Sequence, residues 1–132
     1  MTKLLLMVSA LLAVVVGVAA LIMPVVTGSL LVGATVDTPA GLVAGRIAGA
    51  AILSLGLACW QTRNGEGAAI GVVSALLVYN AAAAMILVYA GVWLKLQSTL
   101  LWLAIVIHWV MAGWCLVNIW MSRRQLSKRR ET

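Results

Sequence analysis

Six residues with hydrogen-bonding or ionisable side chains stand out in this sequence because the chain around them is strongly apolar. Of the 132 residues, 64% are hydrophobic and only 9% are charged. An arginine at the centre of a membrane costs about 2.5 to 3.5 kcal/mol on insertion scales, so each embedded ionisable group calls for a partner or a ligand. The six candidates for a binding site are Arg46, His108, Tyr79, Asn80, Tyr89 and Asp37.

Arg46 and His108 are expected at similar depths in the membrane. Arg46 lies seven residues past Pro39, about 10 Å along a helix at its usual rise per residue, and His108 lies about 13 Å from Thr99 by the same measure. Because both helices would enter the membrane from the same side, these depths predict one polar layer in the outer half of a helical bundle.

The other four candidates would surround this layer. Tyr79 and Asn80 approach it from slightly deeper, Tyr89 lies at its mouth, and Asp37 in the outer loop is placed to reach Arg46 from above. Such a cluster could hold an anion, a lipid headgroup, a quinone or a haem. In a simpler alternative, Arg46 extends to the interface or pairs with Asp37. The histidine is then a neutral imidazole that bonds to Asn80, to Tyr79 or to a helix carbonyl.

Other kinds of chemistry find little support in the residues. One histidine per chain supplies only one axial haem ligand, and Cys115 lies seven residues from His108 with no further zinc ligands nearby. No Asp or Glu falls within a helix core, and the sequence has neither a phosphate loop nor a dinucleotide fingerprint. Cys59 and Cys115 imply no disulfide framework. We therefore predict no metal site, no required cofactor and no catalysis by this chain alone.

The elements that position these residues are apolar segments long enough to cross a membrane. About 20 residues span a hydrocarbon core of roughly 30 Å. Four segments reach this length, and their short links make sequential neighbours antiparallel. The sequence therefore predicts an all-α integral membrane protein, a single domain built as an antiparallel bundle of four transmembrane helices. The predicted helices are residues 3–23, 39–60, 67–90 and 99–121, followed by a basic tail at 122–132.

Basic residues are distributed unequally between the two sides of these spans. With the N-terminus in the cytoplasm, the inner side holds seven of the nine Lys and Arg residues, while Lys95 and Arg46 belong to the outer half. The positive-inside rule then predicts a multi-pass protein of the bacterial inner membrane with both termini in the cytoplasm. The net charge of +6 is explained by contact with membrane lipids, and no nucleic-acid partner is expected.

The connection between the first two spans, residues 24–38, is apolar but interrupted by Pro24, Gly28 and Gly33. This pattern predicts an ordered loop or a short hairpin on the outer interface. Its end is better defined, because Thr38 is a good helix N-cap and the proline that follows it suits a first helical position.

Small residues four positions apart predict which helix faces meet, because helices in lipid associate through close approach of their backbones. The second span presents Gly45, Gly49 and Gly56 on one face, and the third presents Gly71 and Ala75. These faces predict a tightly packed four-helix bundle.

The fourth span carries a row of tryptophans. At about 100° per residue, Trp102, Trp109 and Trp120 fall on one side of the helix, within roughly 20° of each other. His108 lies about 120° away, on a face with small residues that should point into the bundle. The tryptophan side is expected to face lipid or another subunit.

The second and third spans also resemble a known family. Residues 45–64 and 71–91 combine a Gly-Arg pair at the outer start of one helix, glycines along it, an aromatic and a basic residue at its inner end, and a central Tyr-Asn in the next helix. This string is similar to bacterial DoxX-like four-helix membrane proteins of unassigned function. The resemblance implies a small inner-membrane protein, in some cases a subunit or accessory of a membrane oxidoreductase, with Arg46 as the position to watch.

Three functions are compatible with these features. The favoured one is a non-enzymatic accessory or structural subunit of a larger membrane complex, which would explain the small size and the tryptophan row. The alternatives are a protein that holds a quinone, lipid or haem at the polar cluster, and a small transporter or channel that acts as a homo-oligomer.

Overall fold

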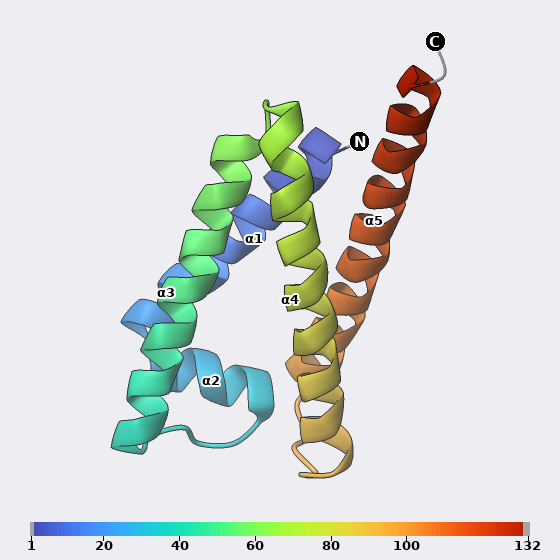
Figure 1. Ribbon diagram of the computed structural model, residues 1–132. Coiled ribbons are helices and arrows are strands. Elements are labelled where there is room, and N and C mark those ends of the chain that lie inside the picture. Colours follow the sequence, from blue (N-terminus) through green and yellow to red (C-terminus); the bar gives the residue numbers. More distant parts are fainter. Residues whose placement is uncertain (1, 131–132) are drawn as a thin grey trace.

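The computed structural model describes residues 2–130, with the side chains described except at 66–68 and 125–130. This part of the chain consists of five helices and short connections (Figure 1). Four of the helices are long and apolar enough to cross a membrane, which confirms the predicted all-α fold. The helices are α1 (Thr2–Ile22), α2 (Pro24–Val32), α3 (Pro39–Thr62), α4 (Glu66–Val92) and α5 (Thr99–Arg130).

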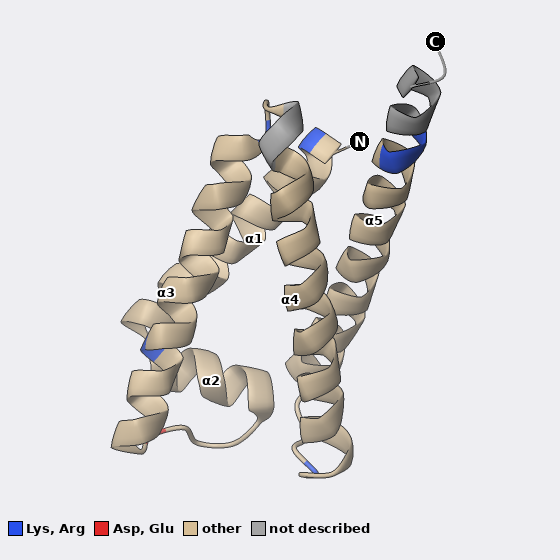
Figure 2. Ribbon diagram, in the orientation of Figure 1, with Lys and Arg blue, Asp and Glu red and all other residues tan. Residues whose placement is uncertain are grey.

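The four long helices run alternately up and down, so the connections gather at two ends. The N-terminus, the α3–α4 connection and the C-terminal end of α5 lie at one end, here named the basic end; α2 and the α4–α5 connection lie at the other, the α2 end (Figure 1). Figure 2 shows that charged residues lie mainly near these ends and that most of the described helical length carries none. This is the arrangement that four membrane crossings require.

The segment after α1 forms a helix, and the predicted loop or hairpin is wrong. Pro24 lies in the first turn of α2, where its missing N–H costs nothing, and Gly33 ends the helix with a left-handed φ of 71°. The proline and glycine, which commonly mark a loop, act here as start and stop signals of a short helix. At its far end α2 is fastened to the α4–α5 connection, because the Ser98 hydroxyl donates to the Leu30 carbonyl at 2.7 Å.

The other helix ends agree with the sequence or extend beyond it. The Thr38 side chain accepts a hydrogen bond from the Gly41 N–H at 3.1 Å, which confirms the predicted start of α3. The fourth helix is longer than predicted, because α5 continues past residue 121 to Arg130. Residues 122–130 contain no proline or glycine and are mostly good helix formers, so the basic tail extends the helix. Residues 131 and 132 lie outside the described range.

Within the four-helix bundle the closest packing is in two antiparallel pairs, α1 with α3 and α4 with α5. Gly49 and Gly56 of α3 lie against α1; a Cβ added at Gly49 would come within 2.9 Å of the Gly17 carbonyl oxygen. Gly45 lies against the ring of Pro24 in α2. The predicted glycine face of α3 is therefore confirmed. On α4 the prediction is wrong at Gly71, which is exposed and has no atom within 4 Å of its Cβ position.

Two apolar clusters hold the helices together at different heights. The basic-end cluster joins all four long helices, whereas the α2-end cluster lies between α4 and α5, with a leucine of α2 packed against it. The basic-end cluster consists of Leu5, Leu6, Ala10, Cys59, Ala69, Val73, Leu76, Met111 and Cys115; the α2-end cluster consists of Leu87, Ala90, Leu101 and Ile105.

Candidate functional site

Asn80 of α4 and His108 of α5 form a hydrogen bond at a height between the two apolar clusters. His108 Nδ1 and Asn80 Oδ1 are 2.8 Å apart, and Asn80 Nδ2 donates to the Leu76 carbonyl, also at 2.8 Å. The short α4–α5 connection makes these two helices antiparallel neighbours, which brings the side chains together. Asn80 is buried and His108 is partly buried.

These bonds determine which imidazole nitrogen carries the proton. Because the amide nitrogen of Asn80 donates to the Leu76 carbonyl, the atom that faces His108 is the amide oxygen, which can only accept. Nδ1 therefore carries the proton. In the neutral imidazole Nε2 keeps its lone pair, so this nitrogen is an acceptor.

The acceptor Nε2 and the hydroxyl of Tyr79 remain available. Neither atom has a hydrogen-bond partner among the described residues. Both atoms also reach the surface of the chain, because the one fully buried side-chain nitrogen or oxygen without a partner among these residues is Ser9 Oγ. The Tyr79 ring packs edge-on against the imidazole, with ring centroids 5.7 Å apart and an interplanar angle of 74°. Two hydrogen-bonding groups thus reach the edge of this cluster without a partner.

The cluster lies at mid-depth, on helix faces that are otherwise packed. Asn80 is roughly midway between Ala69 and Val92, the ends of its apolar span, about 17 Å from each at the helical rise. His108 remains partly exposed, as does Ala104 one turn away, although the other neighbours on the same face of α5 are buried. The packed face of α5 is therefore interrupted at the histidine. These buried neighbours are Leu101, Ile105, Ala112 and Cys115.

The structure does not bring Arg46, Asp37 or Tyr89 into this cluster. Arg46 and Asp37 are both exposed and form no ion pair or hydrogen bond with any described residue. Arg46 belongs to α3, which packs mainly on α1. Tyr89 stacks on Trp93 near the α2 end, with ring centroids 5.8 Å apart. The pairing of His108 with Asn80 is thus observed, whereas the pairing of Arg46 with Asp37 is not.

The tryptophan row of α5 is exposed for about half of its surface, although the Trp102 ring also lies against Gly91 of α4. Trp102, Trp109 and Trp120 are 44%, 52% and 54% exposed, and the Arg124 guanidinium lies over the Trp120 ring at 3.5 Å. Gly113 lies on the same side of the helix, within about 40° of all three tryptophans. It is exposed, with no atom within 4 Å of its Cβ position. We name Trp102, Trp109, Gly113 and Trp120 the tryptophan face.

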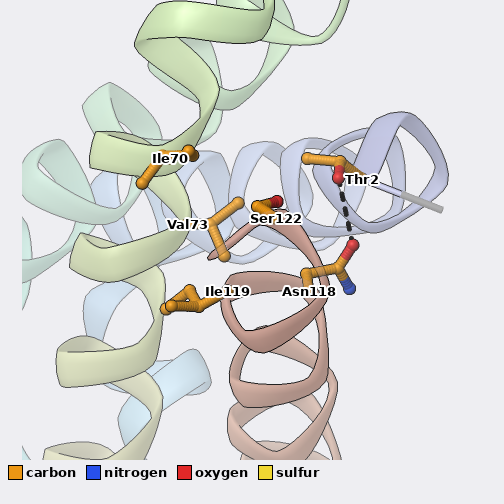
Figure 3. A pocket seen from close by; sticks show the side chains of 6 residues that line it. All are labelled: Thr2, Ile70, Val73, Asn118, Ile119 and Ser122. Carbon is orange, nitrogen blue, oxygen red and sulfur yellow. Dashed lines mark hydrogen bonds between the residues drawn. The ribbon is translucent and has the colours of Figure 1, made fainter. Parts of the chain in front are cut away.

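A shallow hollow with a volume of about 10 Å³ opens near the basic end, between the start of α1, α4 and α5 (Figure 3). The Thr2 hydroxyl donates to Asn118 Oδ1 at 3.1 Å, and Asn118 Nδ2 donates to the Trp114 carbonyl at 2.9 Å. The amide of Asn118 is thus engaged on both sides. Ile70, Val73 and Ile119 supply most of the remaining lining, with Ser122 at the rim. The hollow therefore offers few free polar groups for a ligand.

Comparisons of the chain with protein-family models, with curated proteins and with solved structures found no match. Within the described residues, no three His, Cys, Asp or Glu side chains come together as they would around a metal ion. Cys59 and Cys115 are buried free thiols of the basic-end cluster. The interpretation of function therefore depends on the two features above, the tryptophan face and the His108–Asn80 pair.

Proposed function

We propose that this chain is a non-enzymatic accessory subunit of the membrane, which binds a transmembrane helix of a larger protein through the tryptophan face of α5. The observation that carries the proposal is the open position of Gly113 between exposed tryptophans. A glycine on the outside of a membrane helix lets another backbone approach closely, and the aromatic rings beside it supply a large contact area.

Most other glycines of the spans, apart from the open Gly71 of α4, support this interpretation. Gly17, Gly49 and Gly56 have backbone or side-chain atoms of a neighbouring helix within about 3 Å of their Cβ positions, and Gly91 lies against Leu101 and Trp102. Four glycines are thus used for close helix packing within the chain. Gly113 is also a glycine of a long apolar helix, but no other helix of the chain packs on it. This is expected if its neighbour belongs to another protein.

Leucine at Gly113 should separate the chain from its partner without unfolding it. The position is exposed, and leucine favours a helix over glycine by roughly 1 kcal/mol, so α5 should persist. The measurement is the set of proteins that co-purify in digitonin with the tagged chain from its native membrane. We expect one larger membrane protein in stoichiometric amount with the unmodified chain, and a loss of at least about tenfold for Gly113→Leu.

Gly71→Leu is the matched control, because Gly71 is equally open but lies on α4. This variant should retain the partner. Retention of the partner by Gly113→Leu would contradict the proposed face, and recovery of a symmetric homo-oligomer alone would contradict an accessory role.

The basic end is proposed to face the cytoplasm of a bacterial cell, with both termini and the α3–α4 connection inside. The excess of Lys and Arg at this end supports that orientation. A cysteine in place of Gly65, which lies in the α3–α4 connection, should resist a membrane-impermeant maleimide in intact cells and react after lysis. Lys95→Cys at the α2 end should react in intact cells. The buried Cys59 and Cys115 should remain unlabelled, and labelling at position 65 from outside would refute the orientation.

The resemblance of residues 45–64 and 71–91 to DoxX-like proteins agrees with an accessory role, since some of that group accompany membrane oxidoreductases. Under this proposal Arg46 has no part in the α5 interface, because it lies on α3.

A further inference from the structure

The His108–Asn80 pair raises a question that an accessory role does not answer. At mid-depth in a membrane no water is at hand, so an acceptor or donor that reaches the surface of the chain there is costly without a partner. Nε2 of His108 and the Tyr79 hydroxyl are two such groups, and neither finds a partner within the described residues.

We propose that His108 Nε2 accepts a hydrogen bond from the hydroxyl group of a lipid-soluble ligand that binds beside α5 at the middle of the membrane. The chemistry of the ligand follows from the nitrogen. Because the bond to Asn80 Oδ1 places the proton on Nδ1, Nε2 can only accept, and the ligand must therefore bring a hydrogen-bond donor, of which an O–H group is the simplest.

Depth restricts the ligand further. The cluster lies about 17 Å from either end of the α4 span, which is beyond the reach of phospholipid headgroups at the interface. The ligand must therefore enter the hydrocarbon core, which favours a largely apolar molecule with a hydroxyl group. Phenols and long-chain alcohols share this chemistry. Tyr79 packs edge-on against the imidazole, so the site offers two aromatic rings with which a further ring can pack. We therefore favour a flat phenolic ring as the ligand class.

The packing around the histidine leaves the imidazole partly exposed, so a ligand beside α5 can reach it. Apolar clusters close the α4–α5 contact on the basic-end side and on the α2-end side, whereas the face between them is incompletely covered at His108. Asn80 holds the imidazole in one orientation from the buried side. The acceptor nitrogen is thus fixed in place before a ligand arrives, which reduces the entropy lost on binding.

The chain has a single histidine, which makes a direct test possible. The full chain, purified without a histidine tag and labelled with ¹⁵N-histidine, would be placed in lipid bicelles. Without a ligand, the ¹⁵N spectrum should show a protonated Nδ1 and an unprotonated Nε2. A spectrum with the proton on Nε2 would overturn the proposal at once, because that nitrogen could not then accept.

The ligand would be tested with a matched pair of probes, 4-butylphenol and its methyl ether 4-butylanisole. The two have similar shapes, but only the phenol can donate. We expect the phenol to shift the Nε2 signal and to bind about fivefold more tightly than the ether, the ratio that one neutral hydrogen bond gives. 1-Dodecanol tests whether the hydroxyl group of the ligand is phenolic or aliphatic. If 1-dodecanol binds as tightly as the phenol, the ligand class is aliphatic alcohols and not phenols. An equal affinity for phenol and ether would overturn the proposal.

Two variants separate this role from a structural one, with affinities measured by equilibrium partitioning of the probes. His108→Phe should reduce the ratio of phenol to ether affinity to about one, because the acceptor is gone. Tyr79→Phe keeps Nε2 and should keep most of the ratio. If the ratio survives in His108→Phe, the phenol binds elsewhere and the proposal is wrong. None of these results depends on the tryptophan face, so failure here would leave the accessory role intact.

Discussion

Leucine in place of Gly49 should prevent α1 and α3 from packing and should leave the protein unfolded or aggregated in mild detergent. A Cβ at this position would lie 2.9 Å from the Gly17 carbonyl oxygen, 2.9 Å from the Leu21 amide nitrogen and 3.0 Å from the Ala20 Cβ. Two of these atoms belong to the backbone of α1 and cannot rotate away. The two helices would have to move apart along their whole contact.

The expected loss is about 3 kcal/mol or more, at or above the upper end for an overpacked core, because backbone atoms must be displaced. Lipid chains are as apolar as leucine side chains, so the hydrophobic effect does not drive the separated α1 and α3 to associate again. The measurement is thermal unfolding in dodecyl maltoside, followed by tryptophan fluorescence and light scattering. Gly71→Leu makes the same change on an open face and should leave the melting temperature nearly unchanged. An unchanged melting temperature for Gly49→Leu would contradict this packing.

The glycine face of α3 could be predicted because spacing along one helix determines which side chains share a face. The packing role of Gly49 and Gly56 could be predicted without knowing which helix is the neighbour, because small residues allow any helix to approach closely. The same rule failed at Gly71, which has the right spacing but no neighbour within the chain. Small residues therefore indicate a surface suited to close packing, while the identity of the partner comes from the three-dimensional arrangement.

The polar layer was predicted only in part for a similar reason. Helical rise predicts the height of a residue along its helix, and Arg46 and His108 both lie within apolar spans. Height does not determine which helices adjoin. α3 packs mainly on α1, and Arg46 therefore does not lie beside the histidine. The short link between α4 and α5, in contrast, brings Asn80 beside His108. The link length was a usable signal for that pair.

Two structural features, helix α2 and the open position of Gly113, could not be predicted from the spacing of residues along the sequence. α2 is a helix of nine residues whose proline and glycine lie at its ends. A segment this short has little helical stability of its own and depends on contacts such as that between Ser98 and Leu30. Gly113 differs from the packed glycines only in its surroundings, so the sequence alone could not separate it from them.

Leucine in place of Asn80 should destabilise the α4–α5 pair by about 1 to 2 kcal/mol, the range of the stronger hydrogen bonds between membrane helices. The variant leaves the Nδ1–H of His108 facing an apolar side chain at mid-depth, where no water can replace the lost acceptor. The imidazole could move its proton to Nε2, but Nδ1 would then be an unpaired acceptor at the same place. Either way one nitrogen on the buried side lacks a partner.

His108→Phe, combined with Asn80→Leu, should recover most of that loss. Removing both members of a hydrogen-bonded pair leaves no unpaired group, and apolar replacements of similar size can be nearly neutral. The bond from Asn80 to the Leu76 carbonyl is lost in the single and the double variant alike, so it cancels from the comparison. The measurement is a double-mutant cycle of unfolding free energies, obtained by titrating SDS into bicelles that hold each of the four proteins. A coupling of about 1 kcal/mol would show that the pair acts as a unit. Losses that simply add would mean that the two side chains stabilise the protein independently, and the orientation of the imidazole could then no longer be attributed to Asn80.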